Sequence, residues 1–81
     1  MVHKIQTEMN TLETVDLIET IINRGDIAKI VLNGFSIDVI PGHKIRTLNN
    51  NYLEVYEVND ADNEIILARI QLKNIIGVIS G

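Results

Sequence analysis

The densest group of side chains able to bind a charged ligand lies in the middle of the chain. Lys44 and Arg46 are two residues apart, so on a strand they share one face and can meet the same phosphate backbone. Asn49 follows in an asparagine-rich loop, where a carboxamide can hydrogen-bond the edge of a base. Tyr52 comes directly after the loop and carries a ring that can stack on a base. The residue types and their spacing are suited to contact with single-stranded RNA; the alternative is a solvated hairpin tip with an asparagine-rich loop.

Cationic and amide side chains also alternate near the C-terminal end. The group consists of Arg69, Gln71, Lys73 and the adjacent Asn74. The first three lie two residues apart, and alternate residues of a strand share one face. Repeated around a ring of subunits, they would form a basic band. The alternatives are an ordinary polar face and salt bridges between subunits that involve Glu54 or Glu57.

Residues that could hold a metal ion or catalyse a reaction are few and scattered. His3 and His43 stand alone, whereas a zinc site needs several nitrogen or sulfur ligands at close spacing. Segment 60–64 begins like a calcium loop, but Ile65 and Gln71 stand where that loop needs glycine and glutamate. Neither serine has a histidine beside it, and no glycine-rich phosphate loop is present. We therefore expect no catalysis, metal ion, cofactor or small-molecule substrate.

Length and composition predict one small domain, over residues 1–81, that carries more aliphatic surface than it can bury alone. Isoleucine, leucine and valine supply 29 of the 81 residues, and a chain this short buries only about 60% of its unfolded surface. The surplus favours an oligomer. The net charge of −4 makes the chain a poor general binder of nucleic acid, unless its basic residues gather on one surface.

The composition also bears on the compartment. No apolar run approaches the roughly 20 residues of a membrane span, and segment 1–10 is too polar for a secretory signal. The chain lacks cysteine, which agrees with a reducing compartment. We therefore expect a cytoplasmic protein with no membrane partner. The abundance of asparagine and isoleucine indicates an AT-rich coding sequence, as in bacteria or phages.

The elements that must position these groups follow from hydrophobic periodicity. Apolar residues recur at helical spacing from Leu12 to Ile22, and Gly25 supplies a stop, so we expect a helix over about 11–24. Asn10 and Glu13 have the spacing of a capping box at its start. After Gly25 the period changes toward two, which predicts strands.

The strand region divides at its turn signals. Asn33-Gly34 predicts a hairpin between the first two strands, and Pro41-Gly42 bends or ends the second. We expect five strands, over about 27–32, 35–47, 52–58, 64–72 and 75–79. The predicted fold is therefore mostly β, with an N-terminal helix followed by a five-stranded, strongly bent antiparallel sheet that forms a small barrel.

Part of the chain is similar to a known family. Residues 17–34, LIETIINRGDIAKIVLNG, resemble the helix, short link and first strand of bacterial Hfq, a member of the Sm/LSm family. The run 65–79 is similar to the family's fourth and fifth strands, and the resemblance covers roughly residues 12–80. It implies an Sm-like barrel with RNA contacts near the pore of a ring, at loop 49–51 and at Gln71, Lys73 and Asn74. The alternative is another small SH3-like barrel.

The motifs of the family are incomplete in this chain. Ile45 stands where the first Sm motif carries an aspartate. Where Hfq carries Tyr-Lys-His, this chain has Ile-Gln-Leu at 70–72 or Arg-Ile-Gln at 69–71, depending on register. The Arg-Gly of the second Sm motif is missing. These departures imply an altered uridine pocket on a retained fold.

Assembly is the last expectation from the resemblance. In Sm-like rings the fourth strand of one subunit pairs with the fifth strand of the next, and segment 64–79 is apolar on both faces here. The candidate interface residues are Ile65, Leu67, Ile75, Ile76, Val78 and Ile79. The sequence thus predicts a non-catalytic, homo-oligomeric ring that binds single-stranded RNA. The alternative is an oligomeric protein–protein interaction module on the same barrel, without RNA binding.

Overall fold

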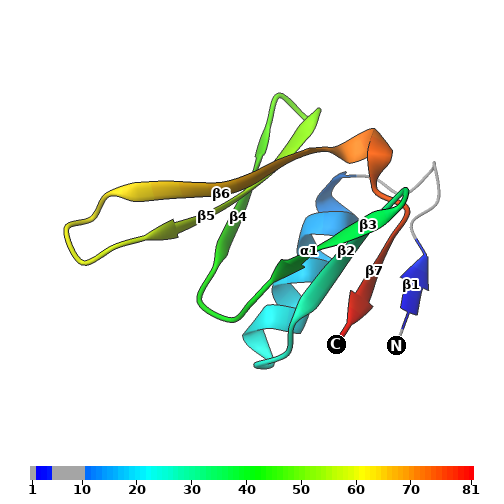
Figure 1. Cartoon of the computed structure of the whole chain (residues 1–81), viewed down its shortest axis with the longest axis horizontal. Coiled ribbons are helices and arrows are strands. Elements are labelled where there is room, and N and C mark those ends of the chain that lie inside the picture. The colour runs from blue at the N-terminus through cyan, green and yellow to red at the C-terminus, as the bar shows by residue number, and fades with distance from the viewer. Residues whose placement is uncertain (1, 5–10) are drawn as a thin grey trace.

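The computed structural model describes residues 2–4 and 11–81 of the chain. The elements are β1 (Val2–Lys4), α1 (Thr11–Asn23), β2 (Ala28–Leu32), β3 (Phe35–Val39), β4 (Lys44–Leu48), β5 (Tyr52–Val58), β6 (Glu64–Gln71), the 3-10 helix η1 (Leu72–Asn74) and β7 (Gly77–Ser80). The described strands form two antiparallel sheets (Figure 1). The first sheet has the order β1-β7-β2-β3, and the second has the order β4-β5-β6.

The helix α1 packs one side against the sheets. Ile18, Ile21 and Ile22 are buried at helical spacing, as the periodicity predicts. The chain leaves the helix at Gly25, whose φ of +91° lies in the left-handed region that glycine adopts without strain. The predicted helix is confirmed, whereas Asn10, its predicted cap, lies outside the described residues. Among those residues, no helix is both long and apolar enough to cross a membrane.

The first sheet is built around the predicted β2–β3 hairpin. Leu32 pairs with Phe35 across the Asn33-Gly34 turn, where Gly34 has a φ of +91°. The other side of β2 pairs with β7, and β7 in turn pairs with β1. The C-terminal strand is therefore an inner strand of this sheet.

A tight corner separates the two sheets. The amide of His43 donates to the carbonyl of Ile40 at 3.0 Å, and the amide of Ile40 donates to His43 Nδ1 at 3.2 Å. Pro41 lacks an amide proton, and Gly42 has a φ of +95°. The backbone between these residues therefore cannot continue a strand, and β4 begins in the other sheet.

The second sheet carries a long hairpin that projects from the body of the molecule. β4 pairs with residues 52–56 only, whereas the β5–β6 ladder continues to the pair Val58 and Glu64. The tip half of the hairpin thus extends beyond the rest of the sheet, on the left of Figure 1. The molecule measures 38 × 27 × 23 Å along its principal axes.

The β5–β6 ladder contains a β-bulge. Val55 pairs with Ala68 and Tyr56 pairs with Ile66, so Leu67 has no partner on β5. A bulge bends the strand that carries it and increases the local twist. It therefore sets the direction in which the tip half of the hairpin projects.

Both sheets contribute to one hydrophobic core. The largest fully buried aliphatic side chains come from the helix, from the first sheet and from the second sheet: Ile18 and Ile21, Ile30, Val39 and Val78, and Leu53 and Val55. The core thus lies between α1 and the two sheets. The second sheet is held to the molecule mainly through the inner face of β5, with Ile70 of β6 in the same core and Ile45 of β4 packed against it.

The mostly β fold with one helix is confirmed over the described residues, but two parts of the prediction are wrong. Six strands follow the helix rather than five, because the corner at Pro41-Gly42 divides the predicted strand 35–47 into β3 and β4. No ladder between the described strands closes the sheets into a barrel, because β3 and β4 belong to different sheets, as do β6 and β7. The sequence analysis also missed β1.

The shared core predicts where truncation is costly. Leu53→Ala removes a side chain that is 0% exposed, and we expect it to reduce the free energy of unfolding by about 2–5 kcal/mol. Ile40→Ala is the control, because Ile40 is 42% exposed at the corner. Urea unfolding followed by circular dichroism measures both. Equal losses for the two variants would contradict a core centred on β5.

Candidate functional site

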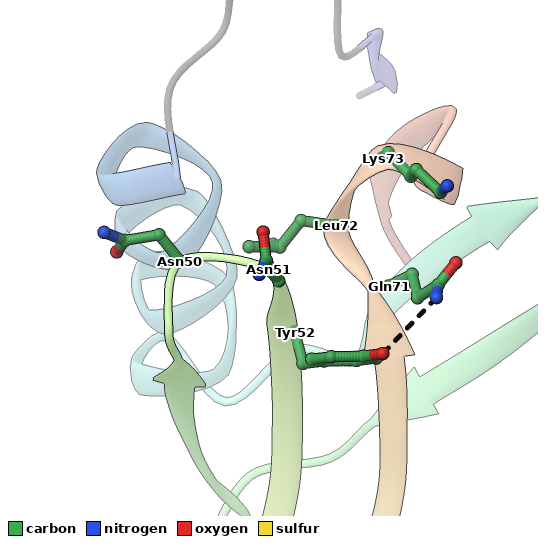
Figure 2. A pocket seen from close by; sticks show the side chains of 6 residues that line it. All are labelled: Asn50, Asn51, Tyr52, Gln71, Leu72 and Lys73. Carbon is green, nitrogen blue, oxygen red and sulfur yellow. Dashed lines mark hydrogen bonds between the residues drawn. The ribbon is translucent and has the colours of Figure 1, made fainter.

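A pocket of about 300 Å³ opens where the β4–β5 turn meets the end of β6 (Figure 2). One wall comes from the turn and the other from the β6–η1 junction. The lining residues are Asn50, Asn51, Tyr52, Gln71, Leu72 and Lys73. The pocket joins members of the two groups that lie far apart in the sequence. Its volume is at the low end of the range of about 300–1,000 Å³ for ligand pockets.

The first wall is a tight turn with a defined backbone. Asn49 and Asn50 have φ angles of 52° and 57°, a left-handed conformation that asparagine tolerates better than most residues. Two successive positive φ angles fit the right-handed twist of the flanking strands. The amide of Asn51 donates to the carbonyl of Leu48 at 3.0 Å and closes the turn. The asparagine-rich loop is therefore held in place before any ligand binds.

Hydrogen bonds join the two walls. The amide of Leu72 donates to the carbonyl of Asn51 at 2.9 Å. The side-chain Nε2 of Gln71 donates to the Tyr52 hydroxyl at 3.4 Å, across the pocket in Figure 2. Asn74 Nδ2 donates to Gln71 Oε1 at 3.2 Å, which fixes the amide orientation of Gln71. The turn and the η1 segment thus form one unit.

The lining combines three kinds of chemical group. Tyr52 is half-buried, and its ring is seen edge-on in Figure 2 at one side of the opening. Gln71 and Asn51 bring carboxamides that both donate and accept hydrogen bonds. Lys73 is exposed and adds a cation. This combination suits a planar group that has hydrogen-bonding edges and is attached to an anion.

The two arginines of the predicted basic groups are held by a buried carboxylate instead of facing the pocket. Glu54 is 1% exposed at the centre of β5. Arg46 Nη2 lies 2.7 Å from Glu54 Oε1, and Arg69 Nη2 lies 2.7 Å from Glu54 Oε2. Arg46 also reaches Glu64 at 3.0 Å and stacks over the Tyr56 ring, 4.3 Å from its centroid. The charges of this cluster balance, so it offers little net attraction to phosphate.

The ion pairs change the titration of both partners. Hydrogen bonds from Arg69 and Arg46 hold the pKa of the Glu54 carboxyl below its ordinary value of 4.5, against the opposing effect of burial. Hydrogen bonds to Glu64 and Glu54 raise the pKa of Arg46 above its ordinary value. Salt bridges to Glu54, named above as an alternative between subunits, form within one chain.

The remaining polar candidates lie at the edge of the site. Lys44 is exposed at the start of β4 and pairs in register with Tyr56, at the far end of the strand from the pocket. Asn49 is exposed in the turn, but its neighbours Asn50 and Asn51 line the pocket. Asn74 supports Gln71 from behind. The structure thus brings Tyr52, Gln71 and Lys73 together and leaves Lys44 apart.

The apolar candidates fall into two sets. Ile65, Leu67 and Ile76 are 41%, 43% and 43% exposed, so their side chains are open to a partner. Ile75 and Val78 are buried in the core of the chain itself, so an interface could use only their backbone. Ile79 is half-buried and pairs in register with Lys29 on β2.

Sequence reasoning missed two features of the site. Leu72 lines the pocket, but nothing in its local pattern separates it from a residue that ends a strand. Glu54 alternates with the core residues Leu53 and Val55, which predicts a side chain on the outer face, yet it is 1% exposed. A carboxylate at such a position needs cationic partners. Over the described ranges, no group of three or more histidine, cysteine or acidic residues could hold a metal ion.

The Glu54 cluster predicts a pH-dependent stability. Because the folded-state pKa of Glu54 is depressed, its contribution is fully present above pH 4.5 and is lost as the pH falls through the folded-state pKa. We expect Glu54→Gln to lower the melting temperature at pH 7, and the difference from the unsubstituted chain to shrink under acid. Thermal unfolding followed by circular dichroism from pH 7 to acid measures it. Glu57→Gln on the same strand is the control, and a constant difference at every pH would contradict the prediction.

Comparisons with other proteins were made on the sequence and on the fold. The chain matches no known protein family, no curated protein and no solved structure. What the site can do therefore has to be argued from its own geometry. That geometry is a rigid pocket with one aromatic ring, several carboxamides and one lysine.

Proposed function

We propose that this chain is a non-catalytic RNA-binding protein that takes one base of a single strand into the Tyr52 pocket. The observation that carries the proposal is the convergence of Tyr52, Gln71 and Lys73 at one opening. An aromatic face, amide groups and a cation are the elements that recognise unstacked bases. Because the pocket has the size of a small ligand, each chain accepts one base.

The three groups divide the work of binding. The Tyr52 ring stacks on the base, because every base offers a π-face. The carboxamides of Gln71 and Asn51 meet the hydrogen-bonding edge of the base. Lys73 lines the exposed rim of the pocket and contacts the phosphate. Arg46 and Arg69 are already paired with Glu54, so the electrostatic contribution of each site is small.

Weak sites of this kind need to act together. In a ring, several pockets bind one strand, and the combined affinity exceeds that of a single site by a large factor. The aliphatic residues on the free edge of β6 support such an assembly, because an exposed apolar edge strand readily pairs with another chain.

The pocket makes a direct prediction for RNA binding. Tyr52→Ala should weaken the binding of a single-stranded oligonucleotide by about 1–3 kcal/mol per occupied site, because the stacking face is lost. Tyr56→Ala is the control, since Tyr56 packs against Arg46 outside the pocket. Fluorescence titration of the assembled protein with oligo-U and oligo-A at low salt measures the affinity. No binding of either oligonucleotide by the unsubstituted protein would contradict the proposal.

Lys73 makes a second prediction about salt. Lys73→Gln should reduce the slope of log affinity against log salt by about one per occupied site, because one phosphate contact is lost. The matched control is Lys29→Gln, because Lys29 lies on β2 in the other sheet with Asp38, 4.0 Å away. The same titrations at several salt concentrations give the slope. An unchanged slope would remove Lys73 from the site.

Assembly has its own test. We expect the chain to scatter light as an oligomer and Leu67→Lys to shift it toward the monomer, because a charge on the free strand opposes pairing. Val58→Lys is the control, since Val58 is 40% exposed on β5 rather than on the edge strand. A stable monomer at every concentration would contradict the ring.

A second candidate function is protein binding by the same assembly. It is favoured by the exposed aliphatic side chains of the projecting hairpin, Val58, Ile65, Ile66 and Leu67. It is also favoured by the net charge of −4 and by the internal pairing of both arginines. It predicts that the assembled protein binds no RNA at low salt and purifies without nucleic acid.

A further inference from the structure

The strand β7 is an inner strand of its sheet only because the short strand β1 pairs with its outer side. One side of β7 pairs with β2 over four residues, from Ala28 opposite Ser80 to Val31 opposite Gly77. The other side pairs with β1 through three pairs only, from Val2 opposite Ile79 to Lys4 opposite Gly77. In Figure 1 these two strands lie side by side on the right of the molecule. Without β1, the backbone of β7 would be a free sheet edge.

The strand β6 is the opposite case, a long strand with nothing on its outer side. It has eight residues, and among the described strands only β5 pairs with it. Ile65, Ile66 and Leu67 are 41%, 46% and 43% exposed along it. Its unpaired amides and carbonyls, together with these side chains, would gain both hydrogen bonds and apolar contact from a second strand.

These two edges cannot meet within one chain. The tip half of β6 lies on the left of Figure 1, and the β7 edge lies on the right. Each copy therefore offers one β6 edge and one β7 edge to different neighbours. A contact between unlike surfaces of this kind runs head to tail, and it closes when the rotation between copies allows.

We infer that β1 is an exchangeable cover, which occupies the β7 edge in the single chain and leaves it to β6 of a second copy. The occupant is another copy of this chain because, among the described strands, only β6 has an unpaired edge of eight residues with three consecutive exposed aliphatics. That edge is longer than β1 and spans all of β7. β1 has the advantage of being on the same chain, so the exchange depends on protein concentration.

The exchange regulates assembly and rests on the ring proposed above. At low protein concentration β1 stays paired with β7 and protects its edge from non-specific pairing. At high protein concentration β6 of a second copy replaces β1 on β7, and the oligomer forms. The pocket is made entirely within one chain, so each copy can still take one base in either state.

A disulfide between β1 and β7 tests the inference. Val2→Cys and Ile79→Cys occupy paired positions, and opposite residues of antiparallel strands lie at Cα distances that a disulfide can span. The chain has no cysteine of its own, so no other disulfide can form within one chain, and non-reducing electrophoresis identifies any disulfide between copies. We expect the oxidised variant to stay monomeric in sedimentation velocity, and the reduced variant to assemble as the unsubstituted chain does.

The control is a disulfide that locks two strands which remain together in both states. Lys29→Cys and Asp38→Cys occupy paired positions on β2 and β3 of the same sheet. This variant should assemble equally when oxidised and when reduced. Deletion of residues 1–4 is the complementary variant, and it should assemble at a concentration about tenfold lower than the full chain. Circular dichroism of each variant verifies that it is folded.

The outcomes separate this inference from the proposed ring. Assembly of the oxidised Val2–Ile79 variant to the same extent as the reduced one would overturn the exchange and leave the ring intact. Unchanged assembly after deletion of residues 1–4 would do the same. A monomer in every variant, at every concentration, would overturn both the exchange and the ring.

Discussion

Neither sheet of this small protein can bury a hydrophobic core by itself, and every other feature depends on how the two sheets and the helix form one core together. The second sheet has only three strands, and its inner face enters the common core through Leu53 and Val55 of the central strand and Ile70 of β6. Three-stranded sheets are stable when one face packs against another element. The helix provides that element by burying Ile18 and Ile21 where the sheets meet. Because β5 is fixed at its centre, its ends are free to carry the pocket and the hairpin.

The outer face of the second sheet carries the buried Glu54 carboxylate, which needs partners of its own. It has no hydrophobic layer over it, and the two arginine side chains cover the Glu54 carboxylate instead. One strand from each side contributes an arginine, so the cluster connects all three strands at one level. The same pairing removes two of the seven basic side chains from any role in binding phosphate. The binding chemistry is thereby moved to the end of the sheet, where Tyr52 and Lys73 lie.

Local signals predict the local elements of this fold well. The helix follows from apolar spacing, the β2–β3 hairpin follows from Asn33-Gly34, and Gly25 marks the helix end. The local sequence does not decide between two geometries at Pro41-Gly42, a bend within one strand or the end of the strand. The predicted strand 35–47 assumed the bend, whereas the chain makes a corner that ends the strand. Three residues are too few for a periodic pattern, so β1 leaves no signal.

The candidate site was predicted in part because its members belong to recognisable chemical types. Tyr52, Gln71 and Lys73 stand out for what their side chains can do, and the structure brings them together. Arg46 and Arg69 have the same apparent suitability, yet they serve the Glu54 cluster. The difference depends on which residue stands opposite on the neighbouring strand. Register of this kind is a tertiary property, and the periodicity of a single strand does not contain it.

The bulge at Leu67 has an electrostatic consequence as well as a geometric one. In a ladder without the bulge, Ile65 would pair with Val58, and the Glu64 side chain would point to the face of the sheet opposite to that of Glu54. The extra residue instead places Glu64 opposite Val58, on the same face as Glu54. From there its carboxylate reaches Arg46 at 3.0 Å. The extra residue, Leu67, is itself apolar, but the register shift that it causes brings Glu64 into the cluster as its second acid. The number of residues in β6 therefore determines the charge balance of the cluster on β4 and β5.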